Sequence, residues 1–420
     1  MSALEQTVPQ GYKQTLAGII PEDWETGYLG DSAQFIGSGK TNTKNKGDFQ
    51  LYGSTGVIGS CALPEYTGPS ILVARVGANA GKLGFADGEY GVSDNTIIIR
   101  LHKNCNLKYF QYWLTRRNLN SLVFGSGQPL ITGSQLKELL LPLPKIEEQT
   151  AIANALSDVD ALLTELEKLI AKKQAIKTAT MQQLLTGKTR LPQFATYTEG
   201  EKQGQTKGTK PSEIGEIPED WDVNKLGELG KFKNGINKDA DSFGHGSPFV
   251  NLMDVFGKPK ISGTEDFGLI NSTALEKKEY SISKGDVLFI RSSVKPSGVG
   301  LTSVALANIE NAVYSGFLIR FRSNKKLDDN FKIHCFYDES FRTRIIAAST
   351  VSANTNINQD SLKEIQIAYP TDINEQPAIA TILSDMDNEI QTLEQRLAKT
   401  RQVKQGMMQE LLTGRTRLPF

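Results

Sequence analysis

The sequence lacks the features that would place a chain in a membrane or outside the cell. No apolar run approaches the roughly 20 residues that a helix needs to cross a bilayer. The first residues, MSALEQTVPQGYKQ, do not join a basic segment to an apolar one, as a secretion signal would. We therefore expect a cytoplasmic protein that makes no contact with a membrane.

Cysteine is scarce, and its distribution argues against two kinds of stabilising site. Cys61, Cys105 and Cys335 are scattered, odd in number and without CxxC spacing. Such a set neither frames a small disulfide-rich fold nor provides the ligand spacing of a zinc site. The histidines are equally scattered, so we expect no metal site in this chain.

An excess of positive charge is missing as well. The 420 residues include 47 Lys plus Arg and 47 Asp plus Glu, so the net charge is zero. Counterion release from DNA requires a concentrated basic surface, which argues against DNA binding by overall charge. If the chain binds DNA, its basic residues must gather locally or a partner must supply part of the phosphate contact.

Motifs of catalysis are also absent. GSGKT at 37–41 is similar to a phosphate-binding loop, but that motif requires glycine at position 34, where glutamine stands. GANAGKL at 77–83 has too few residues between its glycines. The tetrapeptide Asn/Asp-Pro-Pro-aromatic of amino-methyltransferases does not occur. We expect no catalytic residue and no bound cofactor; the alternative, nucleotide hydrolysis at 37–41, would require ATP turnover by the isolated chain.

The sequence instead contains two related copies of one frame. IPEDW occurs at 20–24 and again at 217–221, and residues 148–192 align without gaps on residues 375–419. These 45-residue blocks, EQTAIANALSD…LLTGKTRLP and EQPAIATILSD…LLTGRTRLP, share 24 identities. The stretches between the matched blocks, 25–147 and 222–374, differ in length and sequence. We infer that the frames are structural and that the two inserts carry recognition, rather than that one domain was merely duplicated and drifted.

Both 45-residue blocks predict long helices, since they are rich in good helix formers and contain almost no proline before their ends. Apolar residues recur at steps of four and three, which is the pattern of a helix that packs on another helix. We call these positions the seam residues: Ile152, Leu156, Val159, Leu163, Leu166 and Ile170 in the first helix, and Ile379, Leu383, Met386, Ile390, Leu393 and Leu397 in the second. Two copies of one unit associate most simply about a two-fold axis, which predicts antiparallel pairing within the chain. Homodimerisation through each helix is the alternative.

Each insert predicts a small α/β domain. Short apolar strands at 70–77 and 95–101 precede a helix at 107–118, and the order recurs at 286–294, 317–323 and 330–347. The expected fold class is α+β: two recognition domains separated by two long antiparallel coiled-coil helices, with an internal pseudo-two-fold repeat. The expected boundaries are 1–147 for the first domain, 148–192 for the central helix, 193–216 for a polar linker, 217–374 for the second domain and 375–420 for the C-terminal helix.

Three groups of polar loop residues recur in both inserts and are candidates for reading DNA. Arg and Lys bond guanine, and Asn and Gln bond adenine, in the major groove. Arg75 and Arg291 are the best single candidates, because each follows an apolar strand and precedes a Gly- or Ser-rich turn; a structural salt bridge is the alternative for both. The full candidate set is Lys40, Asn42, Lys44, Lys46, Arg75, Asn79, Lys82, Gln128 and Thr132 in the first insert, and Lys233, Asn237, Lys238, Arg291, Ser292, Lys295, Asn354 and Asn356 in the second.

The order IPEDW, insert, EQxAIAxxLSDxD, long helix and LLTGxTRLP, given twice, resembles the specificity subunit of type I restriction–modification systems. The resemblance covers nearly the whole chain. It implies two target-recognition domains that each read one half of a bipartite asymmetric site in double-stranded DNA, with the helices setting the spacer. It also implies two modification subunits that bind S-adenosylmethionine and two restriction subunits that use ATP and Mg²⁺. This chain itself would bind none of these cofactors.

Two other interpretations remain open. The chain could serve a methylation-only complex that has no nuclease, which the genome neighbourhood would decide. It could also be a scaffold that presents two variable ligand-binding domains to something other than DNA, which the absence of a secretion signal disfavours.

Overall fold

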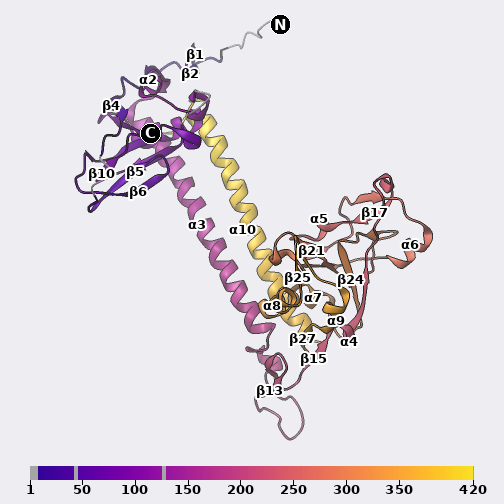
Figure 1. The fold of residues 1–420 in the computed structure, drawn as a ribbon. Coiled ribbons are helices and arrows are strands. Elements are labelled where there is room, and N and C mark those ends of the chain that lie inside the picture. The colour runs from indigo at the N-terminus through magenta and orange to yellow at the C-terminus, as the bar shows by residue number, and fades with distance from the viewer. Residues whose placement is uncertain (1–7, 42–45, 125–128, 420) are drawn as a thin grey trace. The chain divides into compact units, whose positions relative to one another are not determined.

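The computed structural model describes residues 8–41, 46–124 and 129–419 of the chain. The chain divides into two compact units of mixed helix and strand (Figure 1). Unit 1 consists of Met1–Lys168 and Glu394–Phe420, and unit 2 consists of Leu169–Leu393. Both boundaries fall inside the two longest helices, α3 (Ile146–Leu184) and α10 (Glu375–Leu411). Each unit therefore combines one insert with the first part of the helix that follows it and the last part of the other helix.

Unit 1 begins with a hairpin and a further strand on either side of the IPEDW motif, and these strands form two pairs. β1 (Tyr12–Thr15) and β2 (Gly18–Pro21) form a hairpin, and Gly18 has the positive φ of 107° that its turn requires. β3 (Glu25–Tyr28) pairs antiparallel with β12 (Leu140–Leu143), the last strand before α3. Because β3 precedes the insert and β12 follows it, this pair closes the insert into one domain.

The described residues of the insert in unit 1 form two four-stranded sheets and two α-helices. The first sheet has the order β4 (Ala33–Ser38), β11 (Thr96–Leu101), β8 (Ser70–Ala74), β9 (Leu83–Ala86). The second has the order β6 (Gly56–Cys61), β5 (Phe49–Gly53), β10 (Glu89–Val92), β7 (Tyr66–Thr67). The helices are α1 (Leu107–Arg117) and α2 (Gly133–Lys137).

The main core of unit 1 joins the insert to both long helices. Ile71 and Val73 of β8 belong to one buried cluster with Ile152 and Leu156 of α3 and with Leu411 at the end of α10. The intervening residues of β8 face the second sheet instead, so the strand is buried on both sides. This burial explains why the strand appears in the sequence as an unbroken apolar run.

Unit 2 repeats the opening strand pairs and contains one five-stranded sheet and two three-stranded sheets. Its hairpin is β13 (Thr209–Ser212) with β14 (Gly215–Pro218), and β15 (Trp221–Lys225) pairs with β27 (Gln366–Pro370). The main sheet has the order β16 (Gly230–Asn234), β24 (Leu318–Ser323), β20 (Val287–Ile290), β22 (Thr302–Ala305), β18 (Lys260–Ile261). Two smaller sheets have the orders β19 (Gly268–Ile270), β17 (Phe243–Val250), β23 (Val313–Tyr314) and β21 (Ser292–Ser293), β26 (Thr355–Asn356), β25 (Thr350–Val351).

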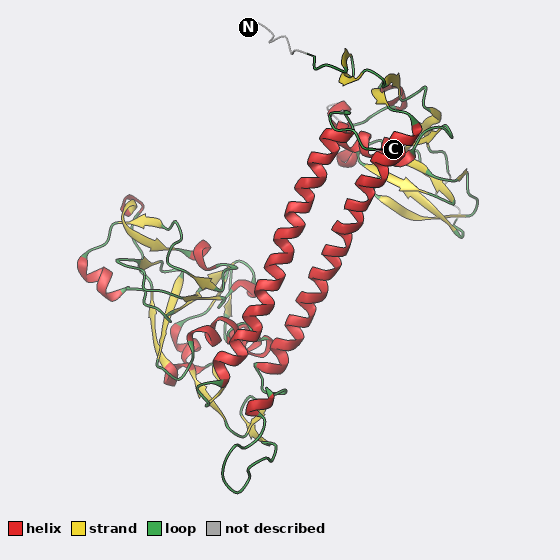
Figure 2. Ribbon diagram, turned by 180° about the vertical axis from the view of Figure 1, so that it is seen from behind, coloured by secondary structure: helices red, strands yellow, loops and turns green. Residues whose placement is uncertain are grey.

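The shorter helices of unit 2 are α4 (Leu226–Leu229), α5 (Leu252–Val255), α6 (Ala274–Glu279), α7 (Asp329–Cys335), α8 (Glu339–Ala347) and α9 (Gln359–Glu364). Its main core is built from elements equivalent to those of unit 1: a buried strand of the insert, the start of one long helix and the end of the other. Val287 and Phe289 of β20 cluster with Ile379 and Leu383 of α10 and with Leu184 at the end of α3. Figure 2 shows the helices in red and the strands of both units in yellow.

The structure corrects two of the expected elements. The helix expected at 330–347 is divided into α7 and α8, because the side chain of Asp338 accepts the N–H of Phe341 and begins a new helix there. The stretch 193–216, expected to be a polar linker, contains β13 and the start of β14. The second hairpin therefore starts inside this stretch, at Thr209. Within the described residues, no helix combines the length and apolar character that crossing a bilayer requires.

In unit 1 the two long helices run in opposite directions. Lys404 Nζ lies 2.5 Å from Asp160 Oδ1, and Arg401 Nη2 lies 2.6 Å from Glu167 Oε1. The residue number falls along α10 as it rises along α3, which is possible only if the paired segments are antiparallel. In Figure 1 the yellow end of α10 lies beside the magenta start of α3.

Unit 2 contains the matching ion pairs. Lys177 pairs with Asp387, and Lys173 Nζ lies 2.7 Å from Glu389 Oε1. Lys177 and Asp387 occupy the positions of Lys404 and Asp160 in the other copy, since 404 − 177 and 387 − 160 both equal 227. The same interhelical pair therefore occurs once in each unit.

The seam residues are all buried or half-buried, but they have two different roles. Ile152 and Leu156 pack into the main core of unit 1, as Ile379 and Leu383 do in unit 2. Leu166 is 4% exposed and lies beyond the main core cluster of unit 1. The first two positions of each seam thus anchor the helix to its own domain.

An ion cluster in unit 1 holds the residues after α10 against the IPEDW motif. Arg417 Nη1 lies 2.9 Å from Asp23 Oδ1, and its Nη2 donates to Glu148 Oε2 at 2.8 Å. Trp24 Nε1 donates to the same carboxylate at 2.9 Å. The hydrogen bonds and charge of Arg417 hold the pKa of Asp23 below its usual range.

The equivalent cluster in unit 2 uses the residues after α3. Arg190 Nη1 lies 2.7 Å from Asp220 Oδ1, and its Nε lies 2.7 Å from Glu375 Oε1. Its guanidinium also lies 5.8 Å from the ring centroid of Trp221. Because TRLP recurs after both helices, each unit receives this arginine from the helix that ends there.

Candidate nucleic-acid interface

In unit 2, Arg291 is the first residue beyond the buried strand β20, and two other loops hold its backbone. Its N–H donates to the carbonyl of Phe317 at 2.8 Å, and its carbonyl accepts the N–H of Ile357 at 2.9 Å. Its Nη1 lies 3.5 Å from the carbonyl of Gly316. The half-buried side chain of Arg291 therefore has a defined position between two polar loops.

Two further candidates lie beside Arg291. Ser292 in β21 is directly opposite Asn356 in β26, although 64 positions separate them in the sequence. The Asn356 side chain donates to the carbonyl of Asn354 at 3.0 Å, and Asn354 itself is exposed at the tip of the turn. The structure thus brings together members of two of the predicted loop groups.

Unit 1 has the same arrangement around Arg75. Its N–H donates to the carbonyl of Asn95 at 2.8 Å, and its carbonyl accepts the N–H of Ile131 at 2.9 Å. Its Nη1 donates to the carbonyl of Asp94 at 3.1 Å. Among the described residues, no carboxylate forms a salt bridge with Arg75 or Arg291, so their other N–H donors remain available to a ligand.

The first loop group joins the same surface in both units. In unit 1 the N–H of Gly39 donates to the carbonyl of Thr96 at 2.9 Å. Lys40 therefore lies beside the loop that contains Asn95, the residue whose carbonyl Arg75 bonds. In unit 2 the N–H of Gly235 donates to the carbonyl of Leu318 at 3.0 Å. Three separate chain segments therefore converge at one edge of each insert.

Several lysines at these edges are exposed and have no carboxylate partner among the described residues. They are suited to contact phosphate, which positions a protein on DNA without reading its sequence. These residues are Lys40, Lys82 and Lys295, while Lys46, in the stretch before β5, is also exposed and has no such partner.

Two other candidate lysines are already paired. Lys233 Nζ lies 3.0 Å from Glu279 Oε2 and 4.6 Å from the ring centroid of Tyr280. Lys238 Nζ lies 2.8 Å from Glu276 Oε2, and its hydrogen bond holds the pKa of Glu276 below the usual range. These contacts reduce the net positive charge that both lysines present to a ligand.

The remaining candidates have mixed environments. The hydroxyl of Thr132 caps α2 by accepting the N–H of Gln135, and so has a local structural role. Asn79 is half-buried in a tight turn, whereas Asn237 is exposed. Three candidates lie outside the described residues: Asn42, Lys44 and Gln128.

Exposed apolar residues that were not among the predicted candidates lie beside both arginines. Phe317 is 57% exposed, and its carbonyl is the one that Arg291 bonds. Val294, which follows β21, is 82% exposed and Val351 of β25 is 75% exposed, while Phe124 is 52% exposed in unit 1. Apolar side chains at such an edge can contact the methyl group of thymine. A phenylalanine in the turn Gly316–Phe317, between two strands, was the available signal.

Comparison with known proteins identifies one family. The family described as "Type I restriction modification DNA specificity domain" matches residues 21–178 and 218–402, one stretch in each half of the chain. The two stretches together cover more than half of the chain, and each includes one insert and most of one long helix.

Relatives match along almost the full length. A protein of Methanocaldococcus jannaschii described as the MjaX type I restriction enzyme specificity subunit is 28% identical over 97% of both chains. The MjaVIII specificity subunit of the same organism is 26% identical over 97% of this chain and 96% of its own. The crystal structure of an S subunit from M. genitalium has the same fold, with a TM-score of 0.55 and 17% identity over 92% of this chain and 96% of that one.

Proposed function

Since the chain belongs to the family of type I restriction modification DNA specificity domains, we propose that it selects the DNA sequence on which a type I restriction–modification complex acts. The observation that carries this proposal is the recurrence of one surface in both units. In each, an arginine that follows a buried strand lies among three converging polar loops. Each unit would read one half of a bipartite asymmetric site in double-stranded DNA, with the exposed lysines on phosphate.

We further propose that the two long helices form an antiparallel coiled coil that relates the halves by a pseudo-two-fold axis and sets the spacer. The interhelical ion pairs that recur at an offset of 227 support this arrangement. In this proposal the recognition domains are 1–147 and 217–374, the helical segments are 148–192 and 375–420, and residues 193–216 connect the halves.

The chemistry would lie in partner subunits in the cytoplasm. Two modification subunits would bind S-adenosylmethionine and methylate adenine, and two restriction subunits would use ATP and Mg²⁺ to translocate and cut DNA. This chain would bind none of these cofactors, because its glycine-rich segments depart from the phosphate-binding motif.

The proposal can be tested in a host that has no DNA methylation of its own. The chain is produced with its modification subunits, and methylated bases are mapped across the genome by long-read sequencing. We expect methylated adenines in one bipartite asymmetric site with a constant spacer. Absence of methylation, together with equal binding of all sequences in a random DNA pool, would contradict the proposal. Adding the restriction subunit distinguishes a complete system from a methylation-only complex, because only the former degrades unmethylated DNA.

A further inference from the structure

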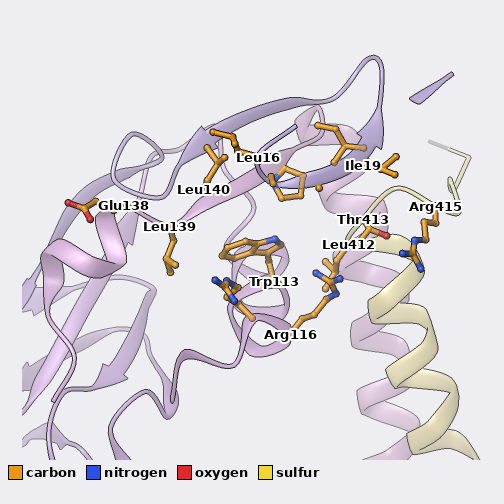
Figure 3. Close-up of a pocket in the computed structure, with 15 residues that line it drawn as sticks. Leu16, Ile19, Trp113, Arg116, Glu138, Leu139, Leu140, Leu412, Thr413 and Arg415 are labelled. Atoms are coloured by element: carbon orange, nitrogen blue, oxygen red, sulfur yellow. The ribbon is translucent and has the colours of Figure 1, made fainter. Parts of the chain in front are cut away.

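Unit 1 contains a pocket of about 610 Å³ that the recognition surface does not use. Its walls come from the β1–β2 hairpin, the C-terminal end of α1, the start of β12 and the residues that follow α10. Figure 3 shows Leu16 and Ile19 of the hairpin on one side, Trp113 and Arg116 of α1 on the other, and Arg415 near the end of α10.

The hairpin side of this pocket presents unburied apolar surface. Leu16 is 94% exposed at the tip of the hairpin, and Ile19 and Leu140 are only half-buried. Trp113, which is 4% exposed, contributes to the lining from α1. An exposed leucine is ordinary by itself, but an exposed leucine that lines a pocket with two other aliphatic residues is typical of a protein-binding site.

The opposite side carries three guanidinium groups. Arg116 and Arg117 have no carboxylate partner among the described residues, and Arg415 has only Glu410, at 3.9 Å. Burial, followed by the charges of Arg415 and Arg117, lowers the pKa of Arg116 below its usual range. Glu138 is the one carboxylate among the lining residues, so the pocket favours an anionic ligand.

Unit 2 has a different chemistry at the equivalent position. The hairpins correspond at an offset of 197, so Glu213 and Glu216 replace Leu16 and Ile19. The strands that follow the inserts correspond at an offset of 226, so Gln366 replaces Leu140, and it is hydrogen-bonded to Glu213. Three aliphatic side chains of the pocket in unit 1 are therefore polar in unit 2, although Ile214 replaces Ala17.

The basic side of the pocket is retained only in part in unit 2, where Lys188 replaces Arg415 at the offset of 227. Tyr112 in unit 1 bonds Asp160, and His334 in unit 2 lies beside the equivalent Asp387, so these two residues correspond. α7 ends at Cys335 and α8 begins at Glu339, so a turn that includes Asp338 stands where α1 of unit 1 continues to its two arginines. Both carboxylates are occupied within unit 2, since Asp338 caps α8 and Glu339 accepts a hydrogen bond from Gln182.

We propose that the pocket of unit 1 binds an acidic segment of a modification subunit. The segment would insert an aliphatic or aromatic side chain beside Leu16 and present carboxylates to the arginines. It would bind once per chain, because unit 2 has Glu213 and Glu216 in place of the aliphatic Leu16 and Ile19. The inference rests on the proposed function, which supplies the partner. A DNA phosphate would also satisfy the arginines, but it has no group that would bury Leu16.

Photo-crosslinking from the hairpin tests this proposal in the assembled complex. Benzoylphenylalanine replaces Leu16 in one sample and Glu213 in the matched control, each in the full chain with its modification subunits and DNA that carries the site. We expect the probe at position 16 to crosslink to one segment of a modification subunit that contains Asp or Glu and a large apolar residue, and the probe at 213 not to reach it. Crosslinking to DNA, to a second copy of this chain or to no partner would overturn the inference.

Charge reversal gives a second measurement. Arg116→Glu with Arg117→Glu should weaken binding of the modification subunits by about tenfold or more, and the loss should shrink at high salt. The matched control is Lys103→Glu with Lys108→Glu, which alters two exposed lysines of the same unit. Leu16→Ala should also weaken binding, whereas Leu63→Ala, at a leucine that is 76% exposed elsewhere in unit 1, should not.

The readouts separate this inference from the proposed function. Equal effects of the test and control variants, in a complex that still methylates its site, would overturn the pocket assignment alone. Failure of the unaltered chain to assemble with modification subunits or to direct methylation would overturn both proposals.

Discussion

At the scale of single residues, Arg75 and Arg291 are the side chains that we expect to read bases. The backbone of each arginine is hydrogen-bonded to two neighbouring loops, and its Nη1 contacts one backbone carbonyl. The other N–H groups of the guanidinium remain available to bond guanine. Replacing either by alanine should cost about 1–3 kcal/mol and relax specificity at one position of one half-site. Competition binding against single-base variants of the site measures both effects. If binding to every variant of the site is weakened equally, the arginine contacts phosphate and does not read sequence.

His334 provides a prediction about pH at the same scale. Its burial lowers the pKa to about 4, so between roughly pH 6.5 and 4 the unfolded chain binds a proton that the folded chain does not. The stability of unit 2 should therefore fall as the pH drops through this window, by up to about 3 kcal/mol from this residue. His334→Gln should reduce the acid sensitivity seen in thermal melts at pH 5 and pH 7. His102→Gln, at an exposed histidine of unit 1, is the matched control.

At the scale of elements, the long helices are predicted to measure the DNA site. Duplicating Leu-Thr-Glu-Leu after Leu166 and Ile-Gln-Thr-Leu after Leu393 lengthens both helices at equivalent positions. Four residues add roughly 6 Å of rise and about 40° of rotation, so the apolar stripe stays nearly in phase. The unread spacer should grow by about one or two base pairs, since each pair spans about 3.4 Å.

Mapping of methylated sites in cells measures that spacer directly. The half-site sequences should not change, because no residue of either insert is altered. A complex that remains active with its original spacer would show that the helices do not set the distance. Altered half-site bases would show instead that the helices take part in reading.

At the scale of the whole molecule, each unit depends on residues from the other repeat. Unit 1 uses Arg417 against Asp23, and the equivalent arginine at the end of the first repeat is Arg190. A fragment of residues 1–210 should therefore dimerise, with Arg190 of one copy replacing Arg417 for the other. With modification subunits, this dimer should methylate a symmetric site, an inverted repeat of one parental half-site, as methylome sequencing would show.

The ion cluster supplies the control for that experiment. Arg190→Ala in the fragment should weaken dimerisation, because the buried carboxylate of Glu148 would lose its charged partner. Arg75→Ala should leave dimerisation intact and impair only DNA recognition. Methylation of an asymmetric site by the fragment would contradict the two-fold arrangement.

The sequence alone determined the family and predicted the two long helices, because these depend on patterns along the chain. The repeated IPEDW and LLTGxTRLP blocks established two copies of one frame, and apolar periodicity in 148–192 and 375–419 predicted the helices. These signals persist whatever the inserts contain, since helical packing needs only apolar side chains at regular spacing. The family match over 21–178 and 218–402 agrees with that interpretation.

Only the tertiary structure decided which residues act together. The pairing of Ser292 with Asn356 depends on strand pairing across 64 positions, which no local pattern encodes. The ion pair between Lys238 and Glu276 and the hydrogen bond by which Thr132 caps α2 are likewise contacts that residue type cannot reveal. Both units also take a helix end from the other repeat, because the antiparallel helices bring each end to the opposite domain. Repeats written one after the other in the sequence are therefore interleaved in the folded chain.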